Sequence, residues 1–385
     1  MTSLLVVLVL ILLGIAIWQI SKIYTLTQIG AGAKIDDSQI ANDKDNSVNG
    51  YLMFAFLVFI YIFTIYGLFK WGGLVLISNA AAEHGKDIDN LMIISFVMIL
   101  IVQFITQALL HYFAFKYRGV EGRKALYFAD NNRLEAIWTI VPVIALSILI
   151  LYGLYTWNTL MFFDEDEEDI LYVEIYAKQF SWEARYAGED NALGKANVRL
   201  IEGINTVGVD MSDPNAKDDI VTNELHLPVG KRVVFKIRSQ DVLHSVYMPH
   251  FRAQMNSVPG MVTQFSFIPT ITTAEFRQFP ETVEKVAHIN DLRRKQSVEL
   301  LAKGEEALEP YEFDYLLLCN KICGASHYNM QMKVVVETQE EFDKWISEQE
   351  TLYSKVFPPK EVETEQSEDI PVEEIATDSL QVAIR

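Results

Sequence analysis

The sequence predicts a membrane-anchored protein with a large β-rich domain outside the bilayer. Four long apolar runs lie between residues 4 and 157 of the 385-residue chain, and runs of this length suit the hydrocarbon core. After residue 170 the pattern changes to short alternating segments separated by Gly, Pro, Asp and Asn, which is typical of a β-sandwich or barrel. Both cysteines of the chain stand in one short segment of that region, Cys319–Met330.

The formal net charge of −19 is concentrated in two segments. Six consecutive acids occupy Asp164–Asp169, and the stretch from Lys360 to Arg385 holds eight acids and two bases. This distribution argues against nucleic-acid binding, which needs clustered Lys and Arg. An acidic surface can steer a basic protein partner, but for residues 358–385 the composition favours a disordered, solvated tail.

The apolar runs are Leu4–Ile20, Tyr51–Phe69, Leu91–Leu110 and Ala136–Trp157. The first has a cleaved signal peptide as its alternative, but it lacks a positive n-region and a small-residue cleavage pattern, which favours a retained span. Residues 26–50 are polar, and we expect a linker there. Lys and Arg gather in the loop at 115–135, so the positive-inside rule places this loop in the cytoplasm and everything after Trp157 outside.

Strands are predicted at 171–177, 232–238, 263–269, 275–279, 313–319 and 330–337. Residues 187–219 break this pattern as a polar loop insertion, and residues 281–308 break it as a helix with a partial apolar stripe. The resulting domains are an N-terminal membrane region with two spans and a linker at 1–80, a membrane hairpin at 81–158, the β domain at 159–357 and the acidic tail at 358–385.

The cysteine segment has the pattern Cys-x3-Cys-x3-His-x2-Met, formed by Cys319, Cys323, His327 and Met330. Thiolate, imidazole and thioether together favour copper among the common biological metals. A disulfide is an alternative for two cysteines in an exported domain. Zinc is another, although methionine is a poor zinc ligand and zinc sites usually pair cysteines at other spacings. The spacing favours copper over both.

Of the seven histidines, His244 is the best candidate for a further ligand. It follows the predicted strand that ends at Arg238, and a sheet edge can hold a ligand rigidly. His84 and His111 belong to the membrane part. Three others are expected to be surface or packing residues: His226, His250 and His288.

Asp-Val-Leu-His-Ser at 241–245, together with the cysteine motif, resembles the cupredoxin-like domain of subunit II of haem–copper oxidases. These are the cytochrome c oxidases with a dinuclear copper A centre. Three further motifs resemble the same family: Leu134–Pro142, Gln179–Trp182 and Val258–Gly260. The resemblance covers about residues 91 to 337. It implies a cupredoxin-like Greek-key barrel or sandwich and an α-helical membrane anchor of about four spans that includes the family's two-helix hairpin.

The resemblance also implies a set of copper ligands. The two cysteines would bridge two copper ions, and each histidine would bind one of the ions. The implied ligands are His244, Cys319, the backbone carbonyl of Lys321, Cys323, His327 and Met330. In the family the residue at Lys321 is usually a glutamate that helps to hold a magnesium or manganese ion near subunit I, so here that second metal site lacks its usual carboxylate.

Three further positions carry implied roles with structural alternatives. Phe180 stands where the family usually has the tryptophan through which electrons enter, so Phe180 and Trp182 are both candidates for the electron route; ordinary core packing is the alternative. Glu135 falls where the family has a glutamate at the mouth of a proton pathway into subunit I, and an interfacial anchor is the alternative.

The resemblance implies a subunit that accepts electrons from a cytochrome c or cytochrome c domain and passes them to haem in subunit I of a proton-pumping oxidase. The chain has no Cys-x-x-Cys-His motif and lacks the histidines in its spans that haem ligation needs, so haem belongs to partners. The expected location is a bacterial inner membrane, with the copper domain on the periplasmic side.

Two other functions are weighed against this one. A quinol oxidase subunit II keeps the fold without copper, but here all five side-chain ligands are present. A membrane-tethered copper-binding or delivery protein would have exposed Met- and His-rich stretches, which this chain lacks. The spans before the hairpin suggest contacts with further oxidase subunits or another respiratory complex.

Overall fold

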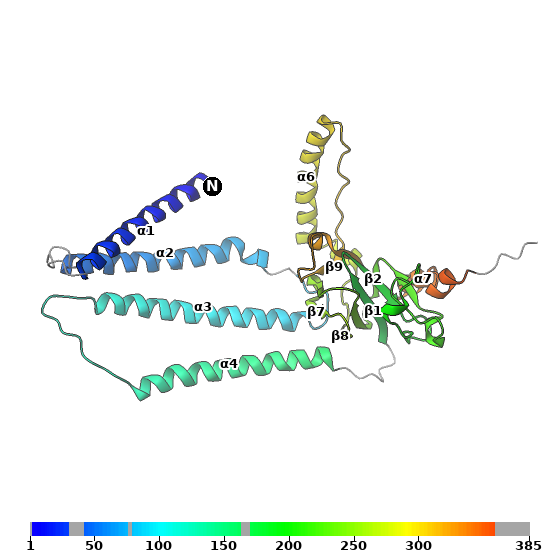
Figure 1. The fold of residues 1–385 in the computed structure, drawn as a ribbon, viewed down its shortest axis with the longest axis horizontal. Coiled ribbons are helices and arrows are strands. Elements are labelled where there is room, and N and C mark those ends of the chain that lie inside the picture. Colours follow the sequence, from blue (N-terminus) through cyan, green and yellow to red (C-terminus); the bar gives the residue numbers. More distant parts are fainter. Residues whose placement is uncertain (1, 31–41, 76–78, 163–169, 359–385) are drawn as a thin grey trace, which may run out of the picture. The chain divides into compact units, whose positions relative to one another are not determined.

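The computed structural model describes residues 2–30, 42–75, 79–162 and 170–358 (Figure 1). The chain forms two compact units. The first comprises Met1–Glu167, Met248–Gln254 and Ser266–Phe313, and the second comprises Glu168–Tyr247, Met255–Phe265 and Asp314–Arg385.

The first unit contains four long helices: α1 Thr2–Gly30, α2 Asp43–Val75, α3 Gly85–Lys116 and α4 Asn132–Met161. Three of them include stretches long and apolar enough to cross a membrane, at Asp43–Gly72, Gly85–Lys116 and Asn132–Asn158. The apolar stretch found in α1, Leu8–Tyr24, is shorter. The predicted α-helical anchor is therefore confirmed with four long helices, of which three are found able to span a membrane within the described residues.

The predicted linker at 26–50 is wrong at both ends. Helix α1 continues to Gly30 and α2 already begins at Asp43, and the residues between them from 31 to 41 lie outside the described part. The polar residues at the start of α2 are helical and contact the segment that follows α3, so they do not form a linker. Asp43 accepts a hydrogen bond from the backbone N–H of Glu121 at 2.8 Å, and Arg118 donates to Ser47 at 3.4 Å.

Helices α2 and α3 are also joined by polar side chains within their apolar stretches. The amide of Gln103 donates to the hydroxyl of Thr64 at 3.2 Å, and the hydroxyl of Tyr61 donates to the carbonyl of Phe104. Such bonds between apolar helices replace the hydrophobic driving force that is missing in lipid. The pair α2 and α3 is therefore specified by side-chain chemistry.

The β domain consists of two five-stranded sheets, with the strand orders β3-β2-β1-β5-β8 and β4-β10-β9-β6-β7. This confirms the predicted cupredoxin-like sandwich. The strands are β1 Ile170–Lys178, β2 Ser181–Tyr186, β3 Ile220–Thr222, β4 Leu225–Pro228, β5 Arg232–Ser239, β6 His244–Met248, β7 Ala253–Ser257, β8 Thr263–Phe267, β9 Tyr315–Cys319 and β10 Gln331–Glu337.

The predicted strand at 275–279 is wrong. Residues Thr273–Phe276 form the short helix α5 because Thr272 and Glu275 make a capping box, in which each side chain accepts from the other residue's backbone N–H. The predicted helix at 281–308 is present as α6, Pro280–Ala302, and ends earlier. All of residues 187–219 are described, and they contain no strand of either sheet.

Two short helices that the sequence did not predict follow the last strand: α7 Gln339–Ser347 and α8 Leu352–Val356. The acidic run at 164–169 and almost all of the predicted disordered tail, from residue 359 on, lie outside the described residues.

The second sheet brings distant parts of the sequence to one edge. Strands β6 and β9 are antiparallel, with Val246 opposite Cys319, and β9 is antiparallel to β10, with Leu318 opposite Gln331. The start of β6, the end of β9 and the start of β10 therefore lie at the same end of the sheet. His244 begins the first of these strands, Cys319 ends the second, and Met330 directly precedes the third.

Candidate metal centre

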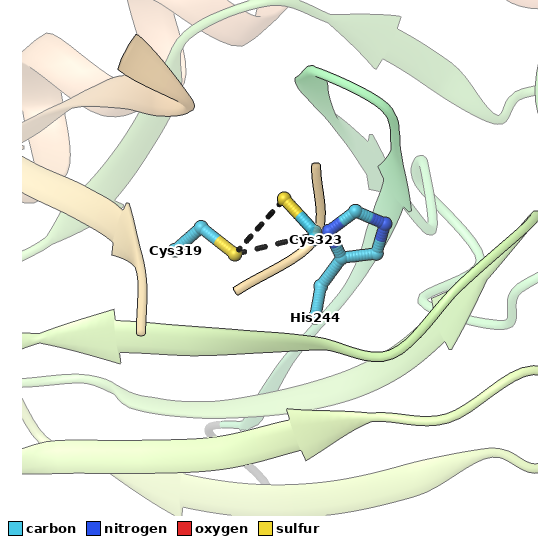
Figure 2. A group of neighbouring side chains, drawn as sticks. All are labelled: His244, Cys319 and Cys323. Atoms are coloured by element: carbon cyan, nitrogen blue, oxygen red, sulfur yellow. Dashed lines mark hydrogen bonds between the residues drawn. The ribbon is translucent and has the colours of Figure 1, made fainter. Parts of the chain in front are cut away.

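One group of metal-binding side chains stands out in the described part of the chain. The donor atoms of His244, Cys319 and Cys323 all lie within 4.8 Å of one another. Figure 2 shows the two thiols and the imidazole converging from different segments of the β domain. The structure thus brings together the first residue of β6, the last residue of β9 and one residue of the loop after β9.

The two cysteines are free thiols, with their Sγ atoms 3.9 Å apart. A disulfide would need a separation of about 2.05 Å, so the structure does not form the disulfide alternative. A metal ion sits about 2.3 Å from a thiolate sulfur. Because 3.9 Å is shorter than twice that distance, one ion can contact both sulfurs, on either side of the line that joins them.

The other predicted donors surround these two sulfurs. His244 Nδ1 lies 3.8 Å and the carbonyl oxygen of Lys321 3.2 Å from Cys319 Sγ. His327 Nδ1 lies 3.5 Å and Met330 Sδ 3.7 Å from Cys323 Sγ. One imidazole and one further donor therefore stand beside each thiol.

The loop that carries these donors is fixed to the sheet at both ends. The backbone N–H of Cys319 donates to the carbonyl of Met330 at 3.1 Å, and that of Asn320 donates to the carbonyl of Ser245 at 3.1 Å. His327 begins a single turn of 3-10 helix at His327–Asn329, and its N–H donates to the carbonyl of Gly324. Backbone hydrogen bonds thus determine where the loop turns its side chains inward.

His244 is completely buried and held by a carboxylate. Its Nε2 lies 2.8 Å from Oδ1 of Asp241, which is an acceptor, so Nε2 donates to this carboxylate and Nδ1 faces Cys319. This is the arrangement by which carboxylates orient metal-binding histidines. Burial tends to raise the pKa of Asp241, but bonds from His244 and from the N–H groups of Gln179 and Val242 outweigh it and hold the pKa below its usual value.

The turn between β1 and β2 covers the cysteine loop. Gln179 donates its side-chain amide to the carbonyl of Cys323 and its backbone N–H to Asp241 at 2.7 Å. Phe180 is half-buried beside Gly324, where a methyl group would lie 2.8 Å from Cζ of the phenyl ring. Gly324 has a φ of +143°, which only glycine adopts readily.

The second predicted aromatic, Trp182, packs directly against the cluster. Its ring lies 6.0 Å from the ring of His244 in an edge-on arrangement, and it is 3% exposed. Its Nε1 has no hydrogen-bond partner within the described residues. Phe180 is therefore the surface aromatic of the pair and Trp182 is the buried one.

The donor set fits copper. Two thiols, two imidazoles and a thioether are soft or borderline ligands, and a thioether is a poor zinc ligand. Burial and the neighbouring Cys319 raise the pKa of the Cys323 thiol to about 11. Metal binding must therefore displace a proton from this residue, since the thiolate is the ligand.

Of the remaining predicted positions, Glu135 lies apart from the cluster and Lys321 contributes only its backbone carbonyl to it. Glu135 belongs to the first unit, where it is exposed in the first turn of α4 after the cap residue Asn131. The side chain of Lys321 is exposed while its carbonyl faces Cys319.

The histidines expected to be surface or packing residues are confirmed in that role. His226 stacks on Trp345 with 3.9 Å between ring centres, and His250 packs against Phe276 and Phe313. His288 is exposed on α6.

Three residues that support the cluster were not predicted as such: Asp241, Gln179 and Gly324. Asp241 stands three residues before His244, and this spacing was the available signal. The contacts of Gln179 and Gly324 join the β1–β2 turn to the cysteine loop, so no local sequence pattern indicates them.

Comparisons with known proteins agree with this architecture. The chain matches the family model described as "Cytochrome C oxidase subunit II, transmembrane domain" over residues 70–157 and that described as "Cytochrome C oxidase subunit II, periplasmic domain" over residues 171–288. The second match ends within α6, before the cysteine loop.

Among curated proteins, the chain is 33% identical over 242 residues to the alternative cytochrome c oxidase subunit 2 of Bradyrhizobium diazoefficiens, covering 62% of this chain and 72% of the relative. It is 24% identical to cytochrome c oxidase subunit 2 of Alkalihalophilus pseudofirmus, covering 73% of this chain and 63% of that protein.

Among solved structures, the periplasmic domain of subunit II of cytochrome oxidase of Bradyrhizobium japonicum is 18% identical, with a TM-score of 0.27, covering 47% of this chain and 93% of that one. The sequence matches decide the assignment. This family implies a copper A centre, and the structure supplies histidine and cysteine side chains that can bind metal. The chain therefore belongs to the cytochrome c oxidase subunit II family.

Proposed function

We propose that this chain is the electron-accepting subunit of a proton-pumping cytochrome c oxidase. It takes electrons from a cytochrome c or cytochrome c domain and delivers them to haem in a separate subunit I, where oxygen is reduced to water. The observation that carries this proposal is the convergence of four further donors on two free thiols at one end of the second sheet. Family membership supports the same conclusion.

The residues that would hold two copper ions are His244, Cys319, the carbonyl of Lys321, Cys323, His327 and Met330. When bound, the copper pair supplies one-electron transfer without an open position for substrate. The chain itself limits rearrangement, because Asp241 fixes the His244 ring and backbone bonds fix both ends of the cysteine loop. Burial of His244, Cys323 and Met330 keeps water away from these three donors.

The metal content tests this assignment directly. Two copper atoms per full-length chain are expected, together with the visible and near-infrared bands of a mixed-valence pair. Cys319→Ser and His244→Asn should both abolish these bands. His288→Asn is the matched control, because it removes an exposed histidine of α6. A ratio of one copper per chain would show that the centre is not dinuclear.

The aromatic residues beside the cluster are proposed to form the electron route. Phe180 lies at the surface over the cysteine loop, and Trp182 packs against His244. Phe180→Ala should slow reduction of the centre by cytochrome c while copper content stays the same. Phe357→Ala, which removes a half-exposed aromatic at the end of α8, is the control. Unchanged rates in Phe180→Ala would remove this residue from the route.

The proposed setting is a bacterial inner membrane, with the β domain on the periplasmic side and subunit I as the main partner. Glu135, at the start of α4, is proposed to lie at the cytoplasmic mouth of a proton pathway into that subunit. Lys321 supplies no carboxylate for a magnesium ion. The proposed domains remain 1–80 for the additional membrane region, 81–158 for the hairpin, 159–357 for the copper domain and 358–385 for the tail.

Purification in mild detergent separates this function from its alternatives. The oxidase function predicts that the chain copurifies with a haem-bearing subunit and that the complex oxidises reduced cytochrome c. A chain that binds copper but purifies without haem would point to copper delivery. A haem-bearing complex that oxidises quinol and contains no copper in this chain would point to a quinol oxidase.

A further inference from the structure

A cationic cavity lies on the first sheet of the β domain, apart from the metal donors. It has a volume of about 410 Å³ and lies between strands β1, β2 and β5 and the loop at 191–196. Its charged lining residues are Glu174, Arg185, Lys236 and Arg238. A second carboxylate, Asp219, pairs with Arg185 from outside the lining. Three cations therefore stand against two carboxylates, which leaves an excess of one positive charge at the cavity in a chain whose overall charge is −19.

The strand register explains why these residues share one face. Glu174 of β1 lies opposite Arg185 of β2 and Lys236 of β5, and Tyr176 lies opposite Arg238. Side chains two residues apart on a strand point to the same side. The intervening residues of β1, such as Val173 and Ile175, are buried in the core.

A single buried carboxylate holds both guanidinium groups. Glu174 accepts from Nε of Arg185 at 2.7 Å and from Nε and Nη2 of Arg238, the latter at 3.1 Å. Burial tends to raise the pKa of Glu174, but the charges and hydrogen bonds of the two arginines outweigh it and hold the pKa below its usual value. The carboxylate therefore stays ionised and fixes both arginines.

Each arginine keeps one terminal nitrogen unused. Arg185 uses Nε and Nη1, the latter on the carbonyl of Gly194 and on Asp219, and Arg238 uses Nε and Nη2. Within the described chain, Nη2 of Arg185 and Nη1 of Arg238 have no hydrogen-bond partner, and neither is a buried atom. Both nitrogens are thus accessible donors of residues that line the cavity.

Lys236 adds a third cation beside them. Its ammonium donates to the side chain of Gln264 and lies 5.9 Å from the centre of the Tyr172 ring. The ammonium has three N–H donors. Because Gln264 accepts from one of them, the others can donate to a ligand. In a purely structural ion-pair network, each cation would instead be paired with a carboxylate, and no positive charge would remain available to a ligand in the cavity.

We propose that this cavity binds a small oxyanion with two or more negative charges, of the phosphate or dicarboxylate class. Guanidinium groups match the geometry of such oxygens, and charge-assisted hydrogen bonds are the strong ones. Residues of the loop at 191–196 line the cavity together with the sheet, and a volume of about 410 Å³ suits a small molecule. The site is separate from the copper ligands and does not depend on the proposed redox function.

Isothermal titration of the full-length chain in detergent tests the proposal. Inorganic phosphate and succinate are the probes, with chloride at the same ionic strength of about 0.1 M as the screening control. We expect saturable binding of at least one probe with a Kd of about 1 mM or tighter, and the preferred probe distinguishes a phosphoryl from a carboxylate ligand.

Two variants locate the binding. Lys236→Gln should raise the Kd of the preferred probe by about tenfold or more, because one charge-assisted hydrogen bond is lost. Lys344→Gln makes the same charge change on exposed α7 and should leave binding unchanged. Ala192→Glu places a carboxylate on the cavity wall and should abolish binding while raising the melting temperature without added anion.

Absence of saturable binding by both probes would overturn the proposal. So would binding that chloride reproduces, or binding that survives unchanged in Ala192→Glu or in folded Lys236→Gln. Because Ala192→Glu leaves the ion-pair network intact, a folding failure of Lys236→Gln does not remove the test.

Discussion

The close approach of Phe180 to Gly324 yields a quantitative prediction. In Gly324→Ala, the added methyl group would lie 2.8 Å from Cζ of Phe180 and 2.9 Å from Nε2 of Gln179. The φ of +143° is a second obstacle for an L-residue. Strained backbone costs about 1–3 kcal/mol and overpacking costs about 1–3 kcal/mol more, so the variant should lose about 2–6 kcal/mol of unfolding free energy.

Two companion variants separate these contributions. Gly230 has a φ of +81°, and a methyl group there would meet no atom within 4 Å, so Gly230→Ala reports the backbone cost alone. The double variant Gly324→Ala/Phe180→Ala removes the overlap with the ring but not that with Gln179. Relative to Phe180→Ala, it should recover the part of the steric cost that the ring causes.

Urea unfolding of the full-length chain in detergent, followed by tryptophan fluorescence, measures these differences. Copper content of the same samples shows whether the displaced loop still holds metal. If Gly324→Ala cost no more than Gly230→Ala, the contact between the β1–β2 turn and the cysteine loop would not have the tightness described above.

Two further predictions concern carboxylates of the β domain. Asp241→Ala should weaken copper retention by about 10–100-fold because His244 loses the partner that fixes its ring, and Asp241→Asn should weaken it less. Dialysis against a chelator measures the retention of both variants. Retention equal to that of the unaltered chain would contradict the role of Asp241. For Asp219, burial raises the pKa to about 6, against the opposing charge of Arg185. The folded state therefore favours the protonated acid, so this stabilisation is fully present below the ordinary pKa of 3.8 and is lost as pH rises through about 6. Relative to Asp219→Asn, the unaltered chain should lose about 2 kcal/mol of unfolding free energy between about pH 4 and about pH 8; a difference that does not change with pH would refute this.

The sequence predicted the elements whose signals are local. Long apolar runs gave the helices of the anchor, and period-two alternation gave β1, β5 and β10 close to their observed bounds. The prediction failed at Thr273–Phe276, where a capping box outweighs the β propensity of a few residues. It also missed α2's polar first turn, which is stabilised by contacts with the loop at 118–121 rather than by its own composition.

The donor residues of the candidate centre were also predictable, because four of them fall within twelve residues and the fifth side chain lies in a recognisable segment. Their arrangement was not. Pairing of β6 with β9 and of β9 with β10 places His244 beside Cys319 across 75 residues of sequence, and the distances that distinguish free thiols from a disulfide exist only after that pairing.

By itself, the sequence determined the chemistry of this protein: an apolar helical anchor, a β domain and a set of soft ligands. Hydrophobic periodicity and ligand type are local properties, so they can be identified from the sequence alone. The tertiary structure decided what supports that chemistry, because Asp241, Gln179 and Gly324 act through contacts between separate strands and loops. It also determined the position of the cationic cavity, because only the register of β1, β2 and β5 brings Arg185, Lys236 and Arg238 to the same face of the sheet as Glu174.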